Sequence, residues 1–192
     1  MGYVRVISGK CKGKKLLVPE RMKVRPLLAR VKKSVFSIIE NKLQGATFLD
    51  LFSGIGSIGI EALSRGAKKV VFVESNKEIA EFLKKNIKLT GFFNQTIVYK
   101  ENVFKICSKL NEQFDVVFID PPYEKYDSMR LLSLFKDGNL VKENGLVLLH
   151  HFYLTKVPAQ VGTLNLITKR RYGQNMVSFY EKKEITDSNL SR

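Results

Sequence analysis

The sequence predicts an α/β protein with a doubly wound, Rossmann-like and mostly parallel sheet. Three observations predict this fold class. Apolar strand-like runs alternate with helical stretches, the first run leads into a glycine-rich turn, and polar residues stand where several runs end. Strands that alternate with helices form right-handed crossovers, which place parallel strands side by side with ligands at their carboxyl ends. Two further strands at the end of the chain predict an antiparallel C-terminal strand.

The hydrophobic periodicity gives the order of the expected elements. Strands are expected at residues 47–52, 69–74, 96–100, 115–119, 145–150, 163–170 and 175–181. Helices are expected at residues 27–43, 57–65, 76–90, 103–110 and 127–136. The chain of 192 residues is long enough for one well-buried core and short for two ordinary domains. We therefore expect a basic N-terminal extension at residues 1–33, one domain at 34–184 and a polar tail at 185–192.

Positive charge is concentrated at the start of the chain. The chain holds 33 Lys and Arg against 18 Asp and Glu, a net charge of +15, and residues 1–33 hold 11 of these bases and one acid. Apolar residues alternate with the charges there, which predicts a basic β-hairpin rather than a solvated tail. Such a hairpin is typical of an RNA-binding arm. The candidate RNA contacts are Arg5, Lys10, Lys12, Lys14, Lys15, Arg25 and Arg30.

The glycine-rich turn after the first domain strand predicts a nucleotide-like cofactor. Gly54, Gly56 and Gly59 satisfy the G-x-G-x-x-G pattern, and Glu74 ends the next strand, where a ribose-binding acid is expected. Asp50 distinguishes two cofactors, because a carboxylate at this strand end opposes a pyrophosphate at the following helix N-terminus. S-adenosylmethionine has no phosphate and carries an ammonium and a sulfonium. Asp50 therefore favours S-adenosylmethionine over a nicotinamide dinucleotide.

The sequence Asp120, Pro121, Pro122 and Tyr123 directly follows the apolar run 116–119. Prolines fix φ and lack an N–H, so this loop leaves the strand stiffly and presents main-chain carbonyls as acceptors. An exocyclic nucleobase amine is a poor nucleophile, because its lone pair is delocalised into the ring. Asp120 and the Pro121 carbonyl are suited to accept its protons, with Tyr123 stacked on the base. The pattern predicts N-methylation of a base, and the simpler alternative is an ordinary turn that ends a strand.

Five motifs together resemble one protein family. They are a basic start at residues 5–16, an Arg-Pro helix at 25–36, the glycine-turn segment at 49–67, the Asp-Pro-Pro-Tyr loop at 120–123 and a hairpin opening at 172–174. In this pattern and over almost its whole length, the chain resembles the RsmD family of bacterial ribosomal RNA guanine-N2 methyltransferases. Two positions depart from the family, which usually has Thr in place of Leu27 and an acid in place of Ala29.

The resemblance implies a class I methyltransferase that uses S-adenosylmethionine to methylate the exocyclic amino group of a guanine in 16S ribosomal RNA. The catalytic residues expected from it are Asp120, Pro121, Pro122 and Tyr123. The expected cofactor-binding residues are Asp50, Phe52, Gly54, Gly56, Glu74, Asn102 and Val103, the last two facing the adenine. The implied partner is ribosomal RNA or an assembling small ribosomal subunit. We expect a cytoplasmic monomer without a metal or a membrane.

Two alternatives stay open at this point. A DNA adenine-N6 methyltransferase could share the Asp-Pro-Pro-Tyr loop, but the chain has no sizeable target-recognition domain. A non-catalytic RNA-binding or assembly module could keep the cofactor fold as a scaffold. The presence of Asp50 and of the loop that begins at Asp120 argues against this second alternative.

Other residues are expected to be structural. Cys11 and Cys107 are widely spaced and predict neither a disulfide framework nor a zinc site. No stretch approaches the ~20 apolar residues of a membrane span, and the basic start lacks the apolar core of a signal peptide. His150 and His151 are expected to be a strand-end pair outside the site. Phe92 and Phe93 are expected to pack under the sheet.

Overall fold

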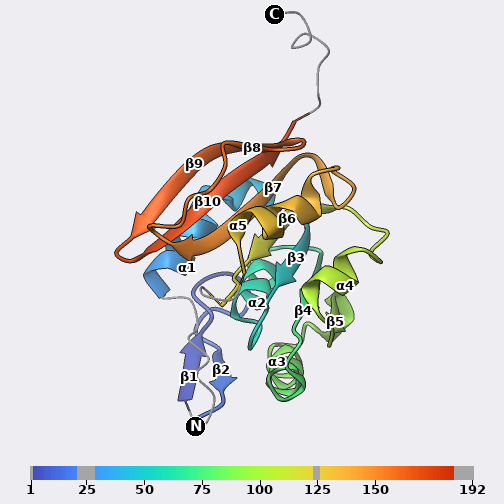
Figure 1. The fold of residues 1–192 in the computed structure, drawn as a ribbon. Helices are drawn as coiled ribbons and strands as arrows, with labels where there is room; N and C mark the ends of the chain where they lie inside the picture. The colour runs from blue at the N-terminus through green and yellow to red at the C-terminus, as the bar shows by residue number, and fades with distance from the viewer. Residues whose placement is uncertain (1, 21–28, 123–125, 184–192) are drawn as a thin grey trace, which may run out of the picture. The chain divides into compact units, whose positions relative to one another are not determined.

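A computed structural model describes the chain except for residues 1, 21–28, 123–125 and 184–192 (Figure 1). Among the described residues, no helix is both long and apolar enough to cross a membrane. The chain divides into two compact units, Met1–Lys109 and Leu110–Arg192.

The first unit contains a two-stranded hairpin and a three-stranded parallel sheet. The antiparallel hairpin pairs β1 (Gly2–Arg5) with β2 (Lys15–Val18). The parallel strands lie in the order β5 (Thr96–Tyr99), β4 (Lys69–Val73) and β3 (Thr47–Leu51). The helices are α1 (Ala29–Ile38), α2 (Ser57–Ser64), α3 (Lys77–Thr90) and α4 (Val103–Cys107), with 3-10 turns η1 (Glu40–Lys42) and η2 (Phe93–Gln95).

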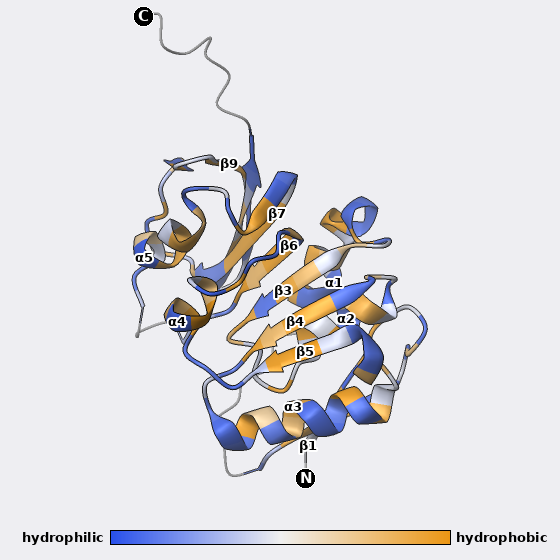
Figure 2. Cartoon of the chain, turned by 90° about the vertical axis from the view of Figure 1, so that its right-hand side faces the viewer, coloured by the Kyte–Doolittle hydropathy of each residue, from blue (hydrophilic) through white to orange (hydrophobic). Residues whose placement is uncertain are grey.

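The core of this unit forms between the strands and the helices that follow them. Phe48 and Leu49 of β3 and Phe72 of β4 are completely buried, as expected for strands covered on both faces. Helix α3 is amphipathic, and Figure 2 shows both hydrophobic and hydrophilic colours along it. Asn76 begins α3 by accepting the N–H groups of its first turn, and Gly91 ends it with a φ of 79°.

A buried carboxylate attaches the chain's basic start to α2. Glu61 has no exposed surface, and its side chain accepts the backbone N–H groups of Ile7 and Ser8 at 2.8 and 2.9 Å. The same carboxylate forms ion pairs with Lys32 at 3.1 Å and with Arg65 at 2.9 Å. Burial lowers the pKa of the Lys32 ammonium, and the attraction of Glu61 opposes this shift. Because the N–H groups of Ile7 and Ser8 both donate to this carboxylate, Glu61 fixes the path of the N-terminal segment over α2.

A buried amide attaches the hairpin itself to α3. Asn86 accepts the N–H of Leu17 at 2.7 Å and donates to the Leu17 carbonyl at 3.1 Å. Its amide also donates to the carbonyl of Ile55 at 3.0 Å. The Asn86 side chain therefore makes the pair of hydrogen bonds with Leu17 that a neighbouring strand would otherwise make. These bonds hold the hairpin against α3 as a packed part of the first unit.

The second unit is a mixed sheet with one parallel and three antiparallel pairings. Its strands lie in the order β6 (Phe114–Ile119), β7 (Val141–Phe152), β10 (Asn175–Lys182), β9 (Leu164–Tyr172) and β8 (Gln160–Val161). Strands β6 and β7 are parallel, and the remaining pairings are antiparallel. Helix α5 (Ser128–Leu132) and the 3-10 turn η3 (Ser133–Phe135) connect β6 to β7. The predicted α/β class, with parallel strands, an antiparallel C-terminal strand and an N-terminal hairpin, is confirmed.

Several boundaries differ from those expected. The helix expected at 27–43 ends at Ile38 and continues as η1, because Ile39 leaves the helical conformation at φ −96° and ψ 10°. The helix expected at 103–110 ends at Cys107, and that expected at 127–136 splits into α5 and η3. Strand β7 begins before residue 145, although Asn144 has a φ of 57°. Asn144 and Gly145 form an Asn-Gly pair, which is typical of a turn, so the sequence predicts a strand that begins only at residue 145.

Candidate active site

Asp50, near the end of β3, forms a hydrogen bond with the first turn of α2. Its side chain is 1% exposed, and Oδ2 accepts the N–H of Gly59 at 2.9 Å. This N–H belongs to the first turn of α2, where helix amides would otherwise attract an anion. Because the Asp50 carboxylate already occupies that position, the turn is unsuited to a pyrophosphate. The contact between Asp50 and Gly59 therefore supports the prediction of a cofactor without phosphate.

Glu74 lies against the same glycine turn. Its Oε2 accepts the N–H of Gly54 at 2.9 Å, and its Oε1 accepts the N–H of Asn76 at 2.8 Å. The backbone N–H of Glu74 donates to Tyr99, the last residue of β5. Glu74, which the sequence places at the end of the strand now labelled β4, is thus held beside the glycine turn by three hydrogen bonds. Each carboxylate oxygen has a second lone pair with which to accept a hydroxyl proton.

The backbone of the turn contains unusual conformations. Phe52 has a φ of 58°, which costs a bulky residue about 1 to 3 kcal/mol. Gly56 has a φ of 83°, and a Cβ there would lie 2.2 Å from Cδ1 of Leu83. Strain of this kind persists where the surrounding structure imposes it, commonly at ligand sites. The structure therefore brings Asp50, Phe52, Gly54, Gly56 and Glu74 together at one turn.

Asn102 and Val103 form the next carboxyl-terminal corner of the first unit. Asn102 is exposed and caps α4, since its Oδ1 accepts the N–H of Phe104 at 2.9 Å. Val103 is 3% exposed and packs into the core. Glu74 directly follows β4 and Asn102 lies three residues past the end of β5, so both residues lie beyond the carboxyl ends of neighbouring parallel strands.

In the second unit, Asp120 follows β6 and contacts a histidine. Nδ1 of His150 lies 2.6 Å from Oδ1 of Asp120. An ionised carboxylate only accepts hydrogen bonds, so Nδ1 carries the proton and donates it. The His150 side chain is 4% exposed, whereas that of Asp120 is 27% exposed. The buried imidazole thus orients a carboxylate that solvent and ligands can reach.

The rest of the loop is described only in part. Pro121 is buried and Pro122 is exposed, so the first proline anchors the loop to the unit. Tyr123, predicted to stack on the base, lies outside the described residues.

Both histidines are expected to lie outside the site, but the structure places His150 in contact with the candidate catalytic residue Asp120. Strands β6 and β7 are parallel and in register, with Ile119 opposite Leu149. The next residues along the two strands are Asp120 and His150, which explains their contact. The signal in the sequence is a pair of four-residue apolar runs, 116–119 and 146–149, each followed directly by a polar residue. Only the strand order shows that these runs are neighbours.

His151 is structural, and its burial predicts a pH dependence of stability. Nδ1 donates to the Phe152 carbonyl at 2.8 Å, and Nε2 lies 2.8 Å from Oγ of Ser178. Burial lowers the pKa of His151, so the unfolded chain binds a proton at a higher pH than the folded protein does. The free energy of unfolding should therefore fall as the pH decreases below about 6.5. Urea denaturation at about pH 7.5 and about pH 5.5 should show a smaller loss in His151→Gln than in wild type; equal losses would contradict this assignment.

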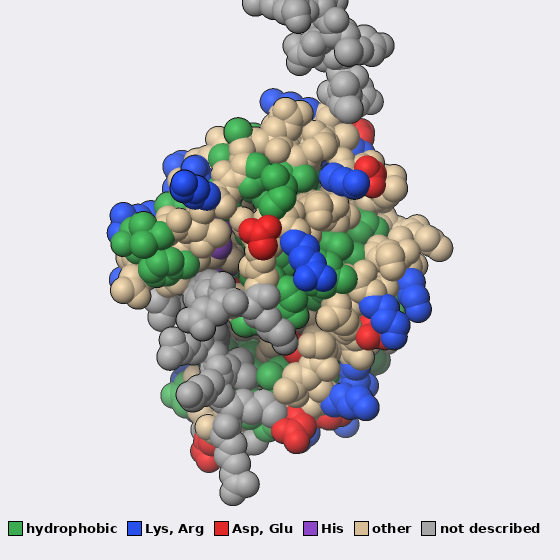
Figure 3. All heavy atoms as spheres, viewed as in Figure 1, with side chains coloured by type: hydrophobic (Ala, Val, Ile, Leu, Met, Phe, Trp, Pro, Cys, Tyr) green, Lys and Arg blue, Asp and Glu red, His purple; other side chains and the backbone are tan. Residues whose placement is uncertain are grey.

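The predicted RNA contacts that the structure describes are all exposed. Arg5 is exposed, as is Arg30 at the start of α1. The four hairpin lysines, Lys10, Lys12, Lys14 and Lys15, are exposed too. Tyr3 is 52% exposed and has the Lys15 ammonium 4.4 Å from its ring centre. Arg25 lies outside the described residues. Figure 3 shows one face of the molecule, on which Lys and Arg side chains are interspersed with a few Asp and Glu side chains.

The parallel α/β strands, the glycine turn and the acids at strand ends define a class I methyltransferase fold. The solved structure of the Escherichia coli protein yhhF agrees, with a TM-score of 0.85 and 25% identity over 95% of this chain and 99% of that one. The family described as conserved hypothetical protein 95 matches residues 4–181. The chain belongs to this family, which is the RsmD family that its motifs resemble.

Two relatives illustrate the family. The Bacillus subtilis protein YlbH is 33% identical over 94% of this chain and 100% of its own length. The ribosomal RNA small subunit methyltransferase D of Haemophilus influenzae is 38% identical over 76% of this chain and 77% of its own length.

Proposed function

We propose that this protein transfers a methyl group from S-adenosylmethionine to the exocyclic amino group of a guanine in small-subunit ribosomal RNA. The observation that carries the proposal is the Asp120 carboxylate, which is partly exposed at a strand end and held by His150 at 2.6 Å. A carboxylate oriented in this way is suited to accept protons from an amine. The relative in Haemophilus influenzae is named for methylation of small-subunit ribosomal RNA, which supports the substrate class.

The residues of the glycine turn fit the proposed cofactor. Bound S-adenosylmethionine supplies an electrophilic methyl group. Glu74 would accept hydrogen bonds from its ribose hydroxyls, while Gly54 would leave bare backbone for close approach and Gly56, packed against Leu83, permits the tight turn. The negative charge of Asp50 suits a cofactor whose amino-acid end carries an ammonium. Asn102 and Val103 would contact the adenine.

The Asp120 loop would orient the target amine. Asp120 and the Pro121 carbonyl would accept its two protons, which directs the nitrogen lone pair toward the methyl group. Orientation of this kind supplies most of the catalysis. The reaction needs no enzyme nucleophile, and burial raises the pKa of the Cys107 thiol to about 12, so this residue stays protonated at neutral pH. The base must be unpaired or flipped for the loop to reach its edge, with Tyr123 stacked on it.

The basic surface would bind the RNA. In this proposal, residues 1–33 form the RNA-binding arm, residues 34–184 carry the cofactor and the reaction, and residues 185–192 form a tail. Glu61 and Asn86 fix the arm against α2 and α3, so its cations are presented on a folded surface. Preorganised cations lose less conformational freedom on binding than a solvated tail does.

The substrate class is tested by following the label from methyl-labelled S-adenosylmethionine. The enzyme is incubated separately with total RNA, with small subunits stripped of proteins to different degrees, and with duplex DNA. Label in small-subunit RNA supports the proposal. Label in DNA alone would favour an adenine-N6 methyltransferase, and no label in any sample would favour a non-catalytic assembly protein.

We expect Glu74→Ala to weaken S-adenosylmethionine binding at least about tenfold. Each hydrogen bond to a charged group contributes about 1.5 to 3 kcal/mol, and the variant removes the proposed bonds to the ribose. Isothermal titration calorimetry measures the affinity, with Glu78→Ala as the control because Glu78 is an exposed acid near the start of α3. Unchanged affinity in Glu74→Ala would remove this residue from the cofactor site.

Replacing Lys10, Lys12, Lys14 and Lys15 together by Ala should weaken RNA binding and make it less dependent on the salt concentration. The log-log slope of affinity against salt should fall by about 0.7 for each phosphate that no longer has a lysine beside it, while cofactor affinity stays unchanged. The control replaces four exposed lysines elsewhere, namely Lys77, Lys85, Lys109 and Lys136. Equal effects of the two quadruple changes would mean that the hairpin binds RNA no more specifically than any basic surface.

A further inference from the structure

A groove with an apolar floor and two lysines lies between α3 and β5. It has a volume of about 590 Å³, within the range of about 300 to 1,000 Å³ that is usual for ligand pockets. We call it the α3–β5 groove. Its lining residues are Lys84, Ile87 and Lys88 of α3, Phe93 of η2, and Thr96 and Val98 of β5.

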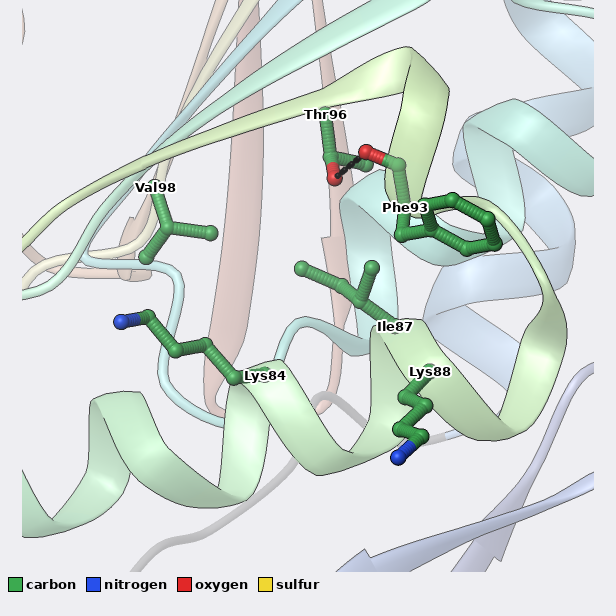
Figure 4. Close-up of a pocket in the computed structure, with 6 residues that line it drawn as sticks. All are labelled: Lys84, Ile87, Lys88, Phe93, Thr96 and Val98. Atoms are coloured by element: carbon green, nitrogen blue, oxygen red, sulfur yellow. Dashed lines mark hydrogen bonds between the residues drawn. The ribbon is translucent and has the colours of Figure 1, made fainter.

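Figure 4 shows how these side chains are arranged. Ile87 points from α3 toward β5, with Val98 and Lys84 on one side of it and the Phe93 ring on the other. The Oγ1 of Thr96 donates to the Phe93 carbonyl at 3.1 Å, which fixes the backbone that carries the ring. Phe93 is 64% exposed, contrary to the expectation that both phenylalanines pack under the sheet, whereas Phe92 is 7% exposed. One ring anchors the turn and the next is presented to solvent.

The groove lies apart from the glycine turn of the same unit. Phe93 and Thr96 stand at the amino end of β5, and Lys88 stands in the last turn of α3. Glu74 and Asn102 follow the carboxyl ends of β4 and β5. The groove is therefore a separate site from the proposed cofactor site.

The residues that line the groove indicate which kind of ligand it can bind. Both charged residues of the lining are lysines, four residues apart on one face of α3, so an anion is favoured. A groove that offers an exposed aromatic ring and, across Ile87 from it, a lysine suits an unpaired base that stacks on the ring while neighbouring phosphates of the RNA contact the ammonium groups of Lys84 and Lys88. We propose that the α3–β5 groove binds an unpaired nucleotide of the RNA substrate, outside the nucleotide that is methylated. This inference rests on the proposed function and adds a second RNA contact to it.

The ring is tested with three replacements of Phe93. Affinity is measured by fluorescence anisotropy with a fluorescein-labelled single-stranded RNA of about ten nucleotides. Phe93→Ala and Phe93→Leu should each weaken binding about 5- to 100-fold, because both lose the stacking ring, and Phe93→Tyr should bind like wild type. A Leu variant that binds RNA like wild type would contradict stacking. The groove would then suit an apolar and acidic protein segment better than a base.

The lysines and the position of the RNA are tested in parallel. Lys84→Ala with Lys88→Ala should lower the salt slope of RNA binding by about 1.4, that is, by about 0.7 for each of two phosphates. The matched control is Lys77→Ala with Lys85→Ala, which changes two exposed α3 lysines outside the groove lining. Photocrosslinking of RNA that contains 4-thiouridine should mark the peptide carrying Phe93. Equal slopes in the two double variants, or no crosslink in that peptide, would overturn the inference.

Failure of this inference can be separated from failure of the proposed function. All groove variants should keep wild-type affinity for S-adenosylmethionine. If wild type methylates RNA and the groove variants bind RNA equally well, the groove assignment is wrong and the proposed function stands. If wild type neither binds nor methylates RNA, both are wrong.

Discussion

Asp120→Asn is expected to lower the single-turnover rate of methyl transfer at least about a hundredfold, because the neutral amide accepts its amine proton without the full negative charge of the carboxylate. Binding of S-adenosylmethionine should change less than about twofold, since Asp120 is proposed to contact the target amine and not the cofactor. A loss confined to the rate identifies an interaction made in the transition state. Single-turnover assays with saturating cofactor and RNA measure this rate directly.

The controls for Asp120 use its partner and a distant acid. His150→Phe keeps a buried ring and removes the donor 2.6 Å from Asp120, so it should lower the rate by a smaller factor than Asp120→Asn does. His150→Asn, which keeps a short donor, should recover part of that loss. Asp137→Asn changes an exposed acid and should have no effect. A fully active Asp120→Asn enzyme would refute the proposed mechanism.

The second large effect is expected on stability. Glu61→Ala should lower the free energy of unfolding by about 3 to 5 kcal/mol, because it leaves the buried Lys32 ammonium without its counter-charge. The N–H groups of Ile7 and Ser8 also lose their acceptor, which detaches the N-terminal segment from α2. Urea denaturation measures the change, and Glu40→Ala, an exposed acid of η1, is the control. A loss below about 1 kcal/mol for Glu61→Ala would show that water replaces these hydrogen bonds and ion pairs.

Much of the fold was predictable because its signals are local. Apolar runs separated by helical stretches mark β3, β4, β5 and β6 to within one residue at every end. The glycine turn was predictable for the same reason, since a strand, a turn and a helix follow each other within a short segment. Asp50 is an example in which sequence position alone indicated the chemistry, and the structure gives the contact that explains it.

Contacts that depend on strand order or tertiary packing were not predictable. The contact of Asp120 with His150 needs β6 and β7 to be neighbours in register, although 30 residues separate the two side chains. Glu61 occupies a helix whose residues are all buried, and its partners come from the distant N-terminal segment. Phe92 and Phe93 are the same residue type in consecutive positions, yet the backbone at η2 buries one and exposes the other.

In the proposed reaction, the methyl group reaches the exocyclic nitrogen of guanine. The most direct measurement is mass spectrometry of nucleosides from small-subunit RNA after incubation with the enzyme and deuterium-labelled S-adenosylmethionine. We expect labelled N2-methylguanosine in the wild-type reaction and almost none with Asp120→Asn. Label in N6-methyladenosine, or on a ring nitrogen, a carbon or a ribose, would contradict the proposed reaction.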